Sequence, residues 1–346
     1  MKASIIIPTL NRADQLCRTM KSLVESDFDQ SQYEIIVIDN GSEDNTRQIV
    51  EKFIKEYPKH IIRYFYDDVP GLLTGRHRGA KEANSETLVF VDDDIHADKS
   101  WLSAIVETFE RYPNVHLVGG KCLPLYESTP PSWINYFWND LPQGGRMLCE
   151  LSLCDYGNKG KIIDPTWVFG LNFSIRKKTL YDLGGFHPDC VPIEYKKFQG
   201  DGETGLSLKM ARKGYKAFYN PKALVYHEVP SSRMTLEYFD KRYFYQGICD
   251  SFTEVRYNHG FKNESVTIEK IKKLLNLLYS IVRKRISPSR SEKEMLQNRF
   301  ESMRGAGYSF HQEMARKSPT VLSWVIKENY FDYNLPEGIG RIKNYN

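Results

Sequence analysis

The 346-residue sequence predicts an α/β fold, in which helices cover both faces of a mostly parallel central sheet, followed by a helical C-terminal region. Two patterns predict this class. Over about the first 120 residues, short apolar runs alternate with segments whose apolar residues recur three and four positions apart. From Met234 onward only the helical spacing remains. The expected strands are 4–8, 34–39, 61–66 and 87–91, and the expected helices are 13–26, 45–57, 73–83 and 100–111.

The alternation of strands and helices breaks near residue 120. Residues 121–165 contain Pro, Gly, Trp and Cys without a clear period, so no element is predicted there. Beyond them the patterns resume. The expected strands are 167–176, 217–219 and 223–226, and the expected helices are 203–212, 234–256, 266–286, 291–304 and 319–328.

The composition excludes some classes of protein. The net charge of +4 is too small, and acids and bases are too well mixed, to indicate nucleic-acid binding. Six cysteines without a C-x-x-C pair favour a reduced cytoplasmic protein. No stretch is long and apolar enough to cross a bilayer, and the N-terminal apolar run is too short for a signal peptide. We therefore expect a cytoplasmic protein.

The segment 270–285 is amphipathic and has a basic face. We favour an ordinary packed helix with a solvated cationic face as the explanation. The alternative is peripheral attachment to the anionic inner face of a membrane. Pairing of two copies of the chain through their C-terminal helices is a further expectation.

Three consecutive carboxylates, Asp92, Asp93 and Asp94, follow the strand-like run that ends at Val91. Adjacent carboxylates repel one another unless a cation compensates their charge. Hard oxygen ligands of this kind suit Mg²⁺ or Mn²⁺, and such ions commonly bind substrate phosphates as well. A metal–diphosphate site is one interpretation of the triplet, and a solvated acidic turn is the other.

Polar residues also follow the first two expected strands. In a parallel sheet the carboxyl ends of neighbouring strands lie at one edge, where ligand-binding crevices form. Asp39 at this edge can accept hydrogen bonds from a base or a ribose, or it can cap the next turn. Neither a Gly-x-Gly-x-x-Gly after the first strand nor a Walker Gly-Lys-Ser/Thr is present, which disfavours a dinucleotide dehydrogenase and a P-loop enzyme. The residues expected here beside the triplet are Pro8, Thr9, Asn11, Arg12, Asp39, Gly41 and Ser42.

Seven segments match a known family in their order and spacing. They are Ile5–Arg12, Glu34–Ser42, Phe90–Ile95, Gly170–Arg176, Gly184–Phe186, Gly200–Leu208 and Lys213–Tyr215. In these segments the chain resembles the inverting family 2 glycosyltransferases of the GT-A fold. The resemblance implies a GT-A catalytic domain at 1–230, made of a nucleotide-sugar-binding half (1–120) and an acceptor-binding half (121–230). The helical region at 231–346 lies outside it.

The resemblance implies a nucleotide-diphosphate sugar as donor, with UDP as the default nucleotide, and Mn²⁺ or Mg²⁺ as cofactor. Asp92 and Asp94 match the ends of the family's Asp-x-Asp signature. Asp94 would bind the metal, and Asp92 would contact the ribose or complete the metal shell. Asp93 and the edge residues named above would line the nucleotide-sugar pocket.

Two further residues are carried over from the family. His227 follows a short expected strand and would complete the metal shell; a histidine hydrogen-bonded at a strand end is the alternative. Arg76 matches a second family segment and would bind the donor. In that segment His77 stands where the family usually has Asn, so only Arg76 is carried over.

The second acid set is Asp201 and Glu203, at the start of an expected helix. The resemblance implies a general base here, which takes the proton of the acceptor hydroxyl as it attacks the anomeric carbon. Glu203 aligns with the family's base and is favoured over Asp201. Capping of the helix is the alternative role for both acids.

The sequence indicates the acceptor-binding residues less clearly. The resemblance places Trp167, Gly170 and Asn172 near the acceptor, although core packing is the commoner role of aromatic residues. The implied function is metal-dependent, inverting transfer of a sugar to a hydroxyl of a glycan or lipid-linked acceptor in surface polysaccharide synthesis. A nucleotidyltransferase is the rival enzyme, and a catalytically inactive carbohydrate-binding or scaffold protein is the rival of another class.

Overall fold

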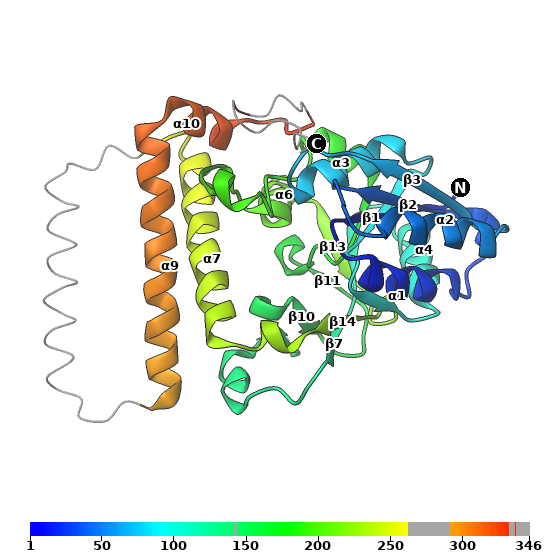
Figure 1. The fold of residues 1–346 in the computed structure, drawn as a ribbon, viewed down its shortest axis with the longest axis horizontal. Coiled ribbons are helices and arrows are strands. Elements are labelled where there is room, and N and C mark those ends of the chain that lie inside the picture. Colours follow the sequence, from blue (N-terminus) through cyan, green and yellow to red (C-terminus); the bar gives the residue numbers. More distant parts are fainter. Residues whose placement is uncertain (142–143, 262–290, 332–335, 337–346) are drawn as a thin grey trace, which may run out of the picture.

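The computed structural model describes residues 1–141, 144–261, 291–331 and 336. Its first third has the expected alternation, and each of the eight elements expected there lies within two residues of its expected bounds (Figure 1). One short strand, β5, was not expected. The elements are β1 (Ala3–Thr9), α1 (Ala13–Val24), β2 (Tyr33–Asp39), α2 (Thr46–Glu56), β3 (Ile61–Tyr66), α3 (Leu72–Glu82), β4 (Thr87–Val91), β5 (Ile95–Ala97) and α4 (Trp101–Arg111).

The middle and C-terminal parts contain shorter strands and longer helices. Short 3₁₀ turns at 30–32, 132–137, 149–151, 165–167, 193–198 and 231–233 connect some of them. The remaining elements are β6 (Val115–Gly119), β7 (Cys122–Tyr126), β8 (Asn139–Asp140), β9 (Arg146–Leu148), β10 (Leu153–Asp155), β11 (Lys161–Ile163), β12 (Asn172–Arg176), α5 (Lys177–Asp182), α6 (Gly202–Arg212), β13 (Lys216–Tyr219), β14 (Val225–Val229), α7 (Leu236–Tyr257), α9 (Glu292–Lys317) and α10 (Pro319–Ile326).

An eight-stranded sheet forms the core, in the order β11-β13-β6-β12-β4-β1-β2-β3. Among these strands β11 and β12 run antiparallel to the other six. Every residue of β1 and β2 is buried, as expected for strands covered on both faces. Helices lie on both sides of the sheet (Figure 1), so the predicted α/β class is confirmed. Because β1 is parallel to both β2 and β4, the three polar strand ends share one edge, with Thr9 opposite Asp39.

A second, six-stranded sheet has the order β5-β14-β7-β10-β9-β8. Four of its strands lie in the segment that has no sequence period, and each is only two to five residues long. The pairing of β14 with β5 sets His227 opposite Ile95, the residue after the acidic triplet. This long-range pairing brings the late histidine to the edge of the main sheet.

Three of the later elements differ from their expected bounds by more than two residues. Strand β14 covers Val225–Val229 where 223–226 was expected, so His227 lies within the strand. The expected strand 167–176 is shorter, because Asp164 accepts the N–H of Thr166 and starts a 3₁₀ turn, so that β12 begins only at Asn172. The expected helix 291–304 continues as α9 to Lys317, although glycines follow Arg304. A Cβ on Gly307 or on Gly247 would collide with the backbone of the facing helix, so both glycines serve the close packing of α9 on α7.

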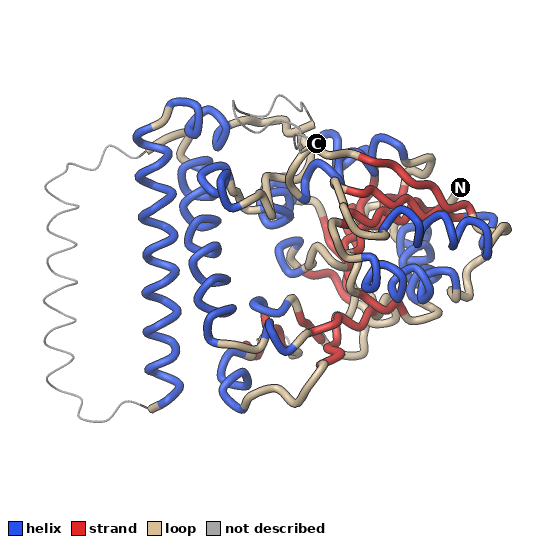
Figure 2. The backbone as a smooth tube through the Cα atoms, viewed as in Figure 1, coloured by secondary structure: helices blue, strands red, loops and turns tan. Residues whose placement is uncertain are grey.

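The C-terminal helices form a layer beside the sheets (Figure 2). Helix α7 packs along α9, and α10 contacts both of them and the turn at 193–198. The expected helix 266–286 and the basic segment 270–285 lie outside the described residues. Of the helices that the structure describes, none combines the length and the apolar character that crossing a bilayer requires.

Candidate active site

The loops after β1 and β2 are joined at the shared edge. Asn11 has a left-handed backbone (φ 52°), and its side chain accepts the N–H of Glu43 at 2.7 Å. Its own N–H donates to Ser42 Oγ at 2.9 Å. Asp39 is 2% exposed and accepts the Tyr64 hydroxyl at 2.7 Å and the Ser42 N–H at 2.8 Å. The structure therefore brings together the edge residues that the sequence predicts.

The acidic triplet is not a solvated turn, because two of its three carboxylates are buried. Asp93 accepts the Thr9 hydroxyl at 2.7 Å and pairs with Arg12 at 2.8 Å. Arg12 also pairs with Asp94 Oδ2 at 2.7 Å. Burial raises the pKa of Asp93 to about 7, although Arg12 opposes this shift. The side chain of Asp92 is 33% exposed and lies 3.4 Å from Arg76. Arg12, which was expected to line the nucleotide pocket, thus compensates the triplet in this structure.

His227 lies directly against the triplet. Its Nδ1 is 2.9 Å from the carbonyl oxygen of Leu151, so Nδ1 carries the hydrogen and Nε2 presents its lone pair. Nε2 faces Asp94 Oδ1 at 3.5 Å, and that oxygen is buried without a hydrogen-bond partner among the described residues. Burial alone would raise the pKa of Asp94, but the positive charges of Arg12 and Arg233 beside it hold that pKa below its usual range.

Arg233 is a site residue that the sequence analysis missed. It ends the 3₁₀ turn Ser231–Arg233, and its guanidinium donates to His227 Nε2 at 2.9 Å and to Asp94 Oδ2 at 3.0 Å. No motif marks it. The only signal was its place six residues after His227, in a short turn that returns toward the triplet.

The Asp94–His227 pair suits a divalent cation. A carboxylate oxygen and an imidazole nitrogen are ligands for Mn²⁺, and the hydrogen bond from His227 Nδ1 orients the ring as for a metal ligand. The partnerless Asp94 Oδ1 is an open acceptor at this place. Within the described ranges, however, no three His, Cys, Asp or Glu side chains form a complete metal site. A cation here would take its other ligands from water and from a bound diphosphate.

The second acid set lies on the other side of a buried arginine. Helix α6 begins at Gly202, so Glu203 stands in its first turn. Arg76, which is 3% exposed, lies with its guanidinium 3.5 Å from Glu203 and 3.4 Å from Asp92. Burial alone would lower the pKa of Arg76, but Glu203 and Asp92 raise it, so the group is a fixed cation. The expected donor residue Arg76 therefore links the triplet to the candidate base.

The two candidate bases have different surroundings. Glu203 is 24% exposed at its side chain and accepts the Gly170 N–H at 3.1 Å. Asp201 is buried, with one oxygen 2.6 Å from His187 Nδ1 and the other accepting the Thr253 hydroxyl at 2.6 Å. Burial would raise the pKa of Asp201, but His187 lowers it. Because both oxygens of Asp201 are engaged in the interior, the geometry favours Glu203.

The three expected acceptor residues are not equivalent. Gly170 contacts Glu203, as described. Asn172 is 1% exposed, accepts Trp101 Nε1–H at 3.0 Å and donates to the carbonyl of Ala223 at 2.9 Å, so its amide serves the core and not an acceptor. Trp167 is half-buried and packs against Tyr156, with ring centroids 5.6 Å apart.

His77, in the place of the family's usual Asn, is also an interior residue. It is fully buried, and its Nε2 accepts the N–H of Phe186 at 2.8 Å. Its ring stacks on Phe331, with centroids 4.2 Å apart. His77 therefore ties α3 to the Gly184–Phe186 turn and to the C-terminal segment.

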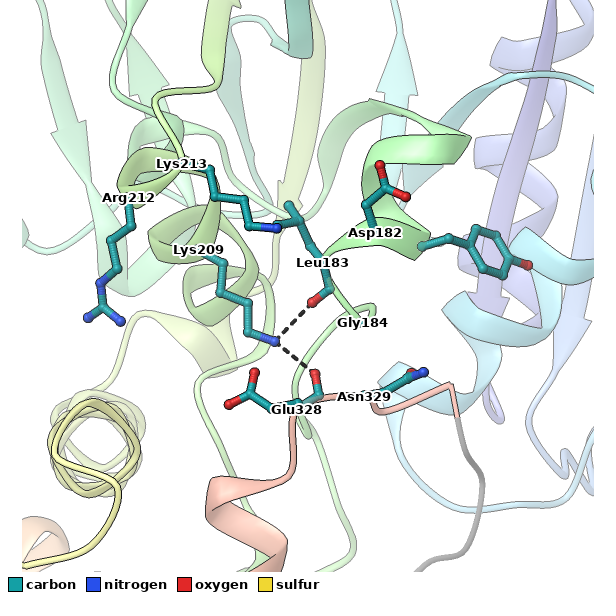
Figure 3. Close-up of a pocket in the computed structure, with 9 residues that line it drawn as sticks. Asp182, Leu183, Gly184, Lys209, Arg212, Lys213, Glu328 and Asn329 are labelled. Carbon is teal, nitrogen blue, oxygen red and sulfur yellow. Dashed lines mark hydrogen bonds between the residues drawn. The ribbon is translucent and has the colours of Figure 1, made fainter.

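Two pockets lie along α6, and neither is lined by the triplet or by Glu203. One, of about 430 Å³, lies between α6 and α7. The other, of about 360 Å³, lies near the end of α6. There Lys209 Nζ donates to the carbonyls of Leu183 and Glu328 at 2.9 and 3.1 Å (Figure 3). Burial lowers the pKa of Lys209 to about 8. This lysine ties the C-terminal segment to α6, and we assign the pocket no role in donor binding.

Comparison with known proteins agrees with this architecture. Residues 4–156 match the family described as glycosyl transferase family 2. Glucosyl-dolichyl phosphate glucuronosyltransferase of Haloferax volcanii is 21% identical over 265 residues, which cover 74% of this chain and 79% of that protein. YfnE of Bacillus subtilis, an uncharacterized glycosyltransferase, is 24% identical over 291 residues. The match covers 74% of this chain and 72% of YfnE.

A solved structure shows the same fold. The mannosyltransferase PcManGT from Pyrobaculum calidifontis, in complex with GDP-Man and Mn²⁺, superimposes with a TM-score of 0.53 at 15% identity, covering 94% of this chain and 85% of that one. The protein is thus a glycosyltransferase with the GT-A fold. Residues 4–156 match glycosyltransferase family 2, in agreement with the sequence resemblance.

Proposed function

We propose that this protein transfers a sugar, with inversion, from a nucleotide-diphosphate donor to an acceptor hydroxyl, using Glu203 as general base and a divalent cation at Asp94. The observation that carries the proposal is the position of Arg76, within 3.5 Å of both Asp92 and Glu203. A sugar bound beside this arginine would have its diphosphate toward the triplet and its anomeric carbon toward the base.

The donor end is supported by the joined loops after β1 and β2. Asp39 would hydrogen-bond the base or the ribose of the donor. Gly41 and Ser42 beside it, and Pro8, Thr9 and Asn11 on the neighbouring loop, would line the same pocket. The PcManGT complex contains GDP-Man and Mn²⁺, which supports a nucleotide sugar and a cation for this chain as well. UDP remains our default nucleotide. The cation, Mn²⁺ or Mg²⁺, would neutralise the leaving diphosphate, with Asp94 and His227 as ligands and Asp92 in the metal shell or on the ribose.

The base end is supported by the environment of Glu203. Its carboxylate is held by the Gly170 N–H and by Arg76, yet its side chain remains partly exposed and can meet an acceptor hydroxyl. Glu203 would take the proton as the hydroxyl attacks from the face opposite the diphosphate. A single displacement of this kind inverts the anomeric centre.

The acceptor is proposed by class only. The Haloferax relative is named a glucosyl-dolichyl phosphate glucuronosyltransferase. This supports a lipid-linked or glycan acceptor in surface polysaccharide synthesis. We assign the catalytic domain to 1–230 and the helical region to 231–346, with a cytoplasmic site and peripheral membrane contact or self-association through the C-terminal helices.

The test compares Glu203→Gln with Asp201→Asn. Glu203→Gln should lower kcat by about 100-fold or more, the usual contribution of a general base, and should leave binding of the nucleoside diphosphate nearly unchanged. Asp201→Asn should be less stable but should turn over in its folded fraction. Chelation by EDTA should stop transfer until Mn²⁺ is restored, and the product should have the opposite anomeric configuration to the donor by NMR.

Three outcomes would count against the proposal. If Glu203→Gln turned over like the wild type, the base would be wrongly assigned. Release of pyrophosphate in place of a nucleoside diphosphate would identify a nucleotidyltransferase. Binding of a nucleotide sugar without transfer to any glycan or lipid-linked acceptor would favour the inactive binding protein.

A further inference from the structure

We propose that Arg233 exchanges partners during the catalytic cycle. It holds Asp94 and His227, and when a divalent cation and the donor bind it moves onto the donor diphosphate. The inference rests on the proposed function, since it requires a cation and a diphosphate at this edge of the sheet. It assigns a role to a residue that no motif marks.

The present partners of Arg233 are the two residues that would hold the cation. Its Nη1 donates to His227 Nε2 at 2.9 Å, and its Nη2 donates to Asp94 Oδ2 at 3.0 Å. Within the part of the chain that the structure describes, its side chain has no other hydrogen-bond partner. The side chain of Arg233 is 24% exposed and that of Asp94 is 2% exposed, so the arginine covers the carboxylate from the solvent side.

Arg233 and a cation cannot use His227 at the same time. The Nε2 lone pair now accepts the arginine N–H, and a metal ion would need the same lone pair. The other ring nitrogen cannot substitute, because its hydrogen is held by the carbonyl of Leu151 at 2.9 Å. Binding of a cation to His227 therefore has to release at least one arm of Arg233.

Arg12 is held differently, although it shares the same carboxylate oxygen. It pairs with Asp93 Oδ1 at 2.8 Å as well as with Asp94 Oδ2 at 2.7 Å. Its link to Asp93 would persist after a cation reached Asp94, because Asp93 is not among the expected metal ligands. Of the two arginines, only Arg233 holds a group, His227 Nε2, that a cation between His227 and Asp94 Oδ1 would have to take from it.

The released guanidinium has a matching destination. Its planar fork of N–H groups fits two phosphate oxygens, and such charge-assisted pairs are stronger than neutral hydrogen bonds. Arg12 and Arg233 together compensate Asp93 and Asp94. When a divalent cation takes over part of this compensation, the negative diphosphate that arrives with it can take up Arg233.

The experiment measures binding, not turnover. Isothermal titration would give Kd for Mn²⁺ alone, and for UDP and GDP each in saturating Mn²⁺, on the wild type, Arg233→Gln, Arg233→Lys and the control Arg18→Gln. Arg18 is a suitable control because it pairs with Glu228, next to His227, and its loss removes the same charge. Thermal unfolding without ligand would show that the variants are folded.

The exchange predicts opposite changes in the two affinities. Arg233→Gln should bind Mn²⁺ alone about threefold more tightly or better, because the competing cation is gone. It should bind the nucleotide that the wild type prefers about tenfold more weakly or worse, because a charge-assisted contact is lost. Arg233→Lys should bind the nucleotide with intermediate affinity, and Arg18→Gln should resemble the wild type.

The failures are distinguishable. If the wild type bound neither UDP nor GDP in an Mn²⁺-dependent way, the proposed function would fail, and this inference with it. If the wild type bound one of them and Arg233→Gln matched Arg18→Gln in both affinities, the exchange alone would be wrong. Weaker binding of Mn²⁺ alone by Arg233→Gln would also overturn it, since Arg233 would then support Asp94 and not compete for it.

Discussion

Gly170 donates its backbone N–H to Glu203 Oε1 at 3.1 Å, and its missing side chain leaves the space in which the Arg76 guanidinium lies. A Cβ built on Gly170 would stand 2.5 Å from Arg76 Nη2 and 3.0 Å from Glu203 Cδ. The N–H of Gly170 therefore binds one carboxylate oxygen of Glu203, and the absence of a side chain on Gly170 lets Arg76 approach the other oxygen.

Gly170→Ala should impair transfer strongly because the new methyl group must displace Arg76 or Glu203. We expect kcat to fall by about tenfold or more, since small displacements of a positioned group are costly. Stability should fall by about 1–3 kcal/mol, as for other overpacked sites. Steady-state kinetics and urea unfolding would measure the two effects.

Gly305→Ala is the matched control for this change. A Cβ at Gly305 meets no atom within 4 Å, and the residue lies in a helix of the C-terminal layer, so transfer should be unaffected. Wild-type kcat in Gly170→Ala would contradict the close approach of Arg76 and Glu203.

The sequence was informative where local pattern decides structure. The strand that ends at Asp39 and the one that precedes Asp92 are apolar runs buried on both faces, and a parallel sheet brings their ends together. Arg233 could not be found in this way, because its role depends on the pairing of β14 with β5, which are far apart in the chain. Local sequence contains no information on that register.

Asn172 shows the opposite difficulty. A polar residue beside a family motif is typical of a binding site, yet this amide is buried because Trp101 and Ala223 satisfy its hydrogen bonds. Those partners come from α4 and from the loop before β14, and no local pattern indicates that they meet. Strands β8, β9 and β10 of the second sheet were missed for a simpler reason, since two or three residues are too few to show a period.

The crossing of α7 and α9 supplies a prediction about stability. Gly307→Ala should destabilise the protein by about 1–3 kcal/mol or more, because its Cβ would collide with the backbone of Phe244 and the helices would have to separate. Gly305→Ala, two residues away in the same helix, should stabilise by about 0.5–1 kcal/mol, since alanine is the better helix former where space is open. Urea unfolding monitored by circular dichroism would compare them.

The contrast between two glycines of one helix is the informative measurement. A stabilising Gly307→Ala would mean that α7 and α9 do not approach as closely as described. A destabilising Gly305→Ala would mean that this face of α9 is covered in solution.

Acid should destabilise the fold through its buried histidines. His77, His187 and His311 are 1% exposed or less, and burial lowers their pKa to about 3, 4 and 4. In the unfolded chain a histidine binds a proton near pH 6.5. Below that pH the unfolded state binds protons that the buried histidines of the folded state do not bind. The stabilisation of the folded state that is present above pH 6.5 is therefore lost between pH 6.5 and about 4. Each histidine contributes a slope of up to about 1.4 kcal/mol per pH unit.

His311 allows this effect to be isolated, because it lies in α9 beside Ser251, and burial lowers its pKa although Asp201 opposes the shift. Asp93, whose pKa is raised to about 7, acts in the opposite direction as pH falls, so the total pH dependence alone is not diagnostic. The difference in unfolding free energy between the wild type and His311→Gln cancels such contributions. We expect this difference to change in favour of the variant as pH falls from 6.5 toward 4. Parallel curves for His311→Gln would mean that His311 is protonated equally in the folded and unfolded states.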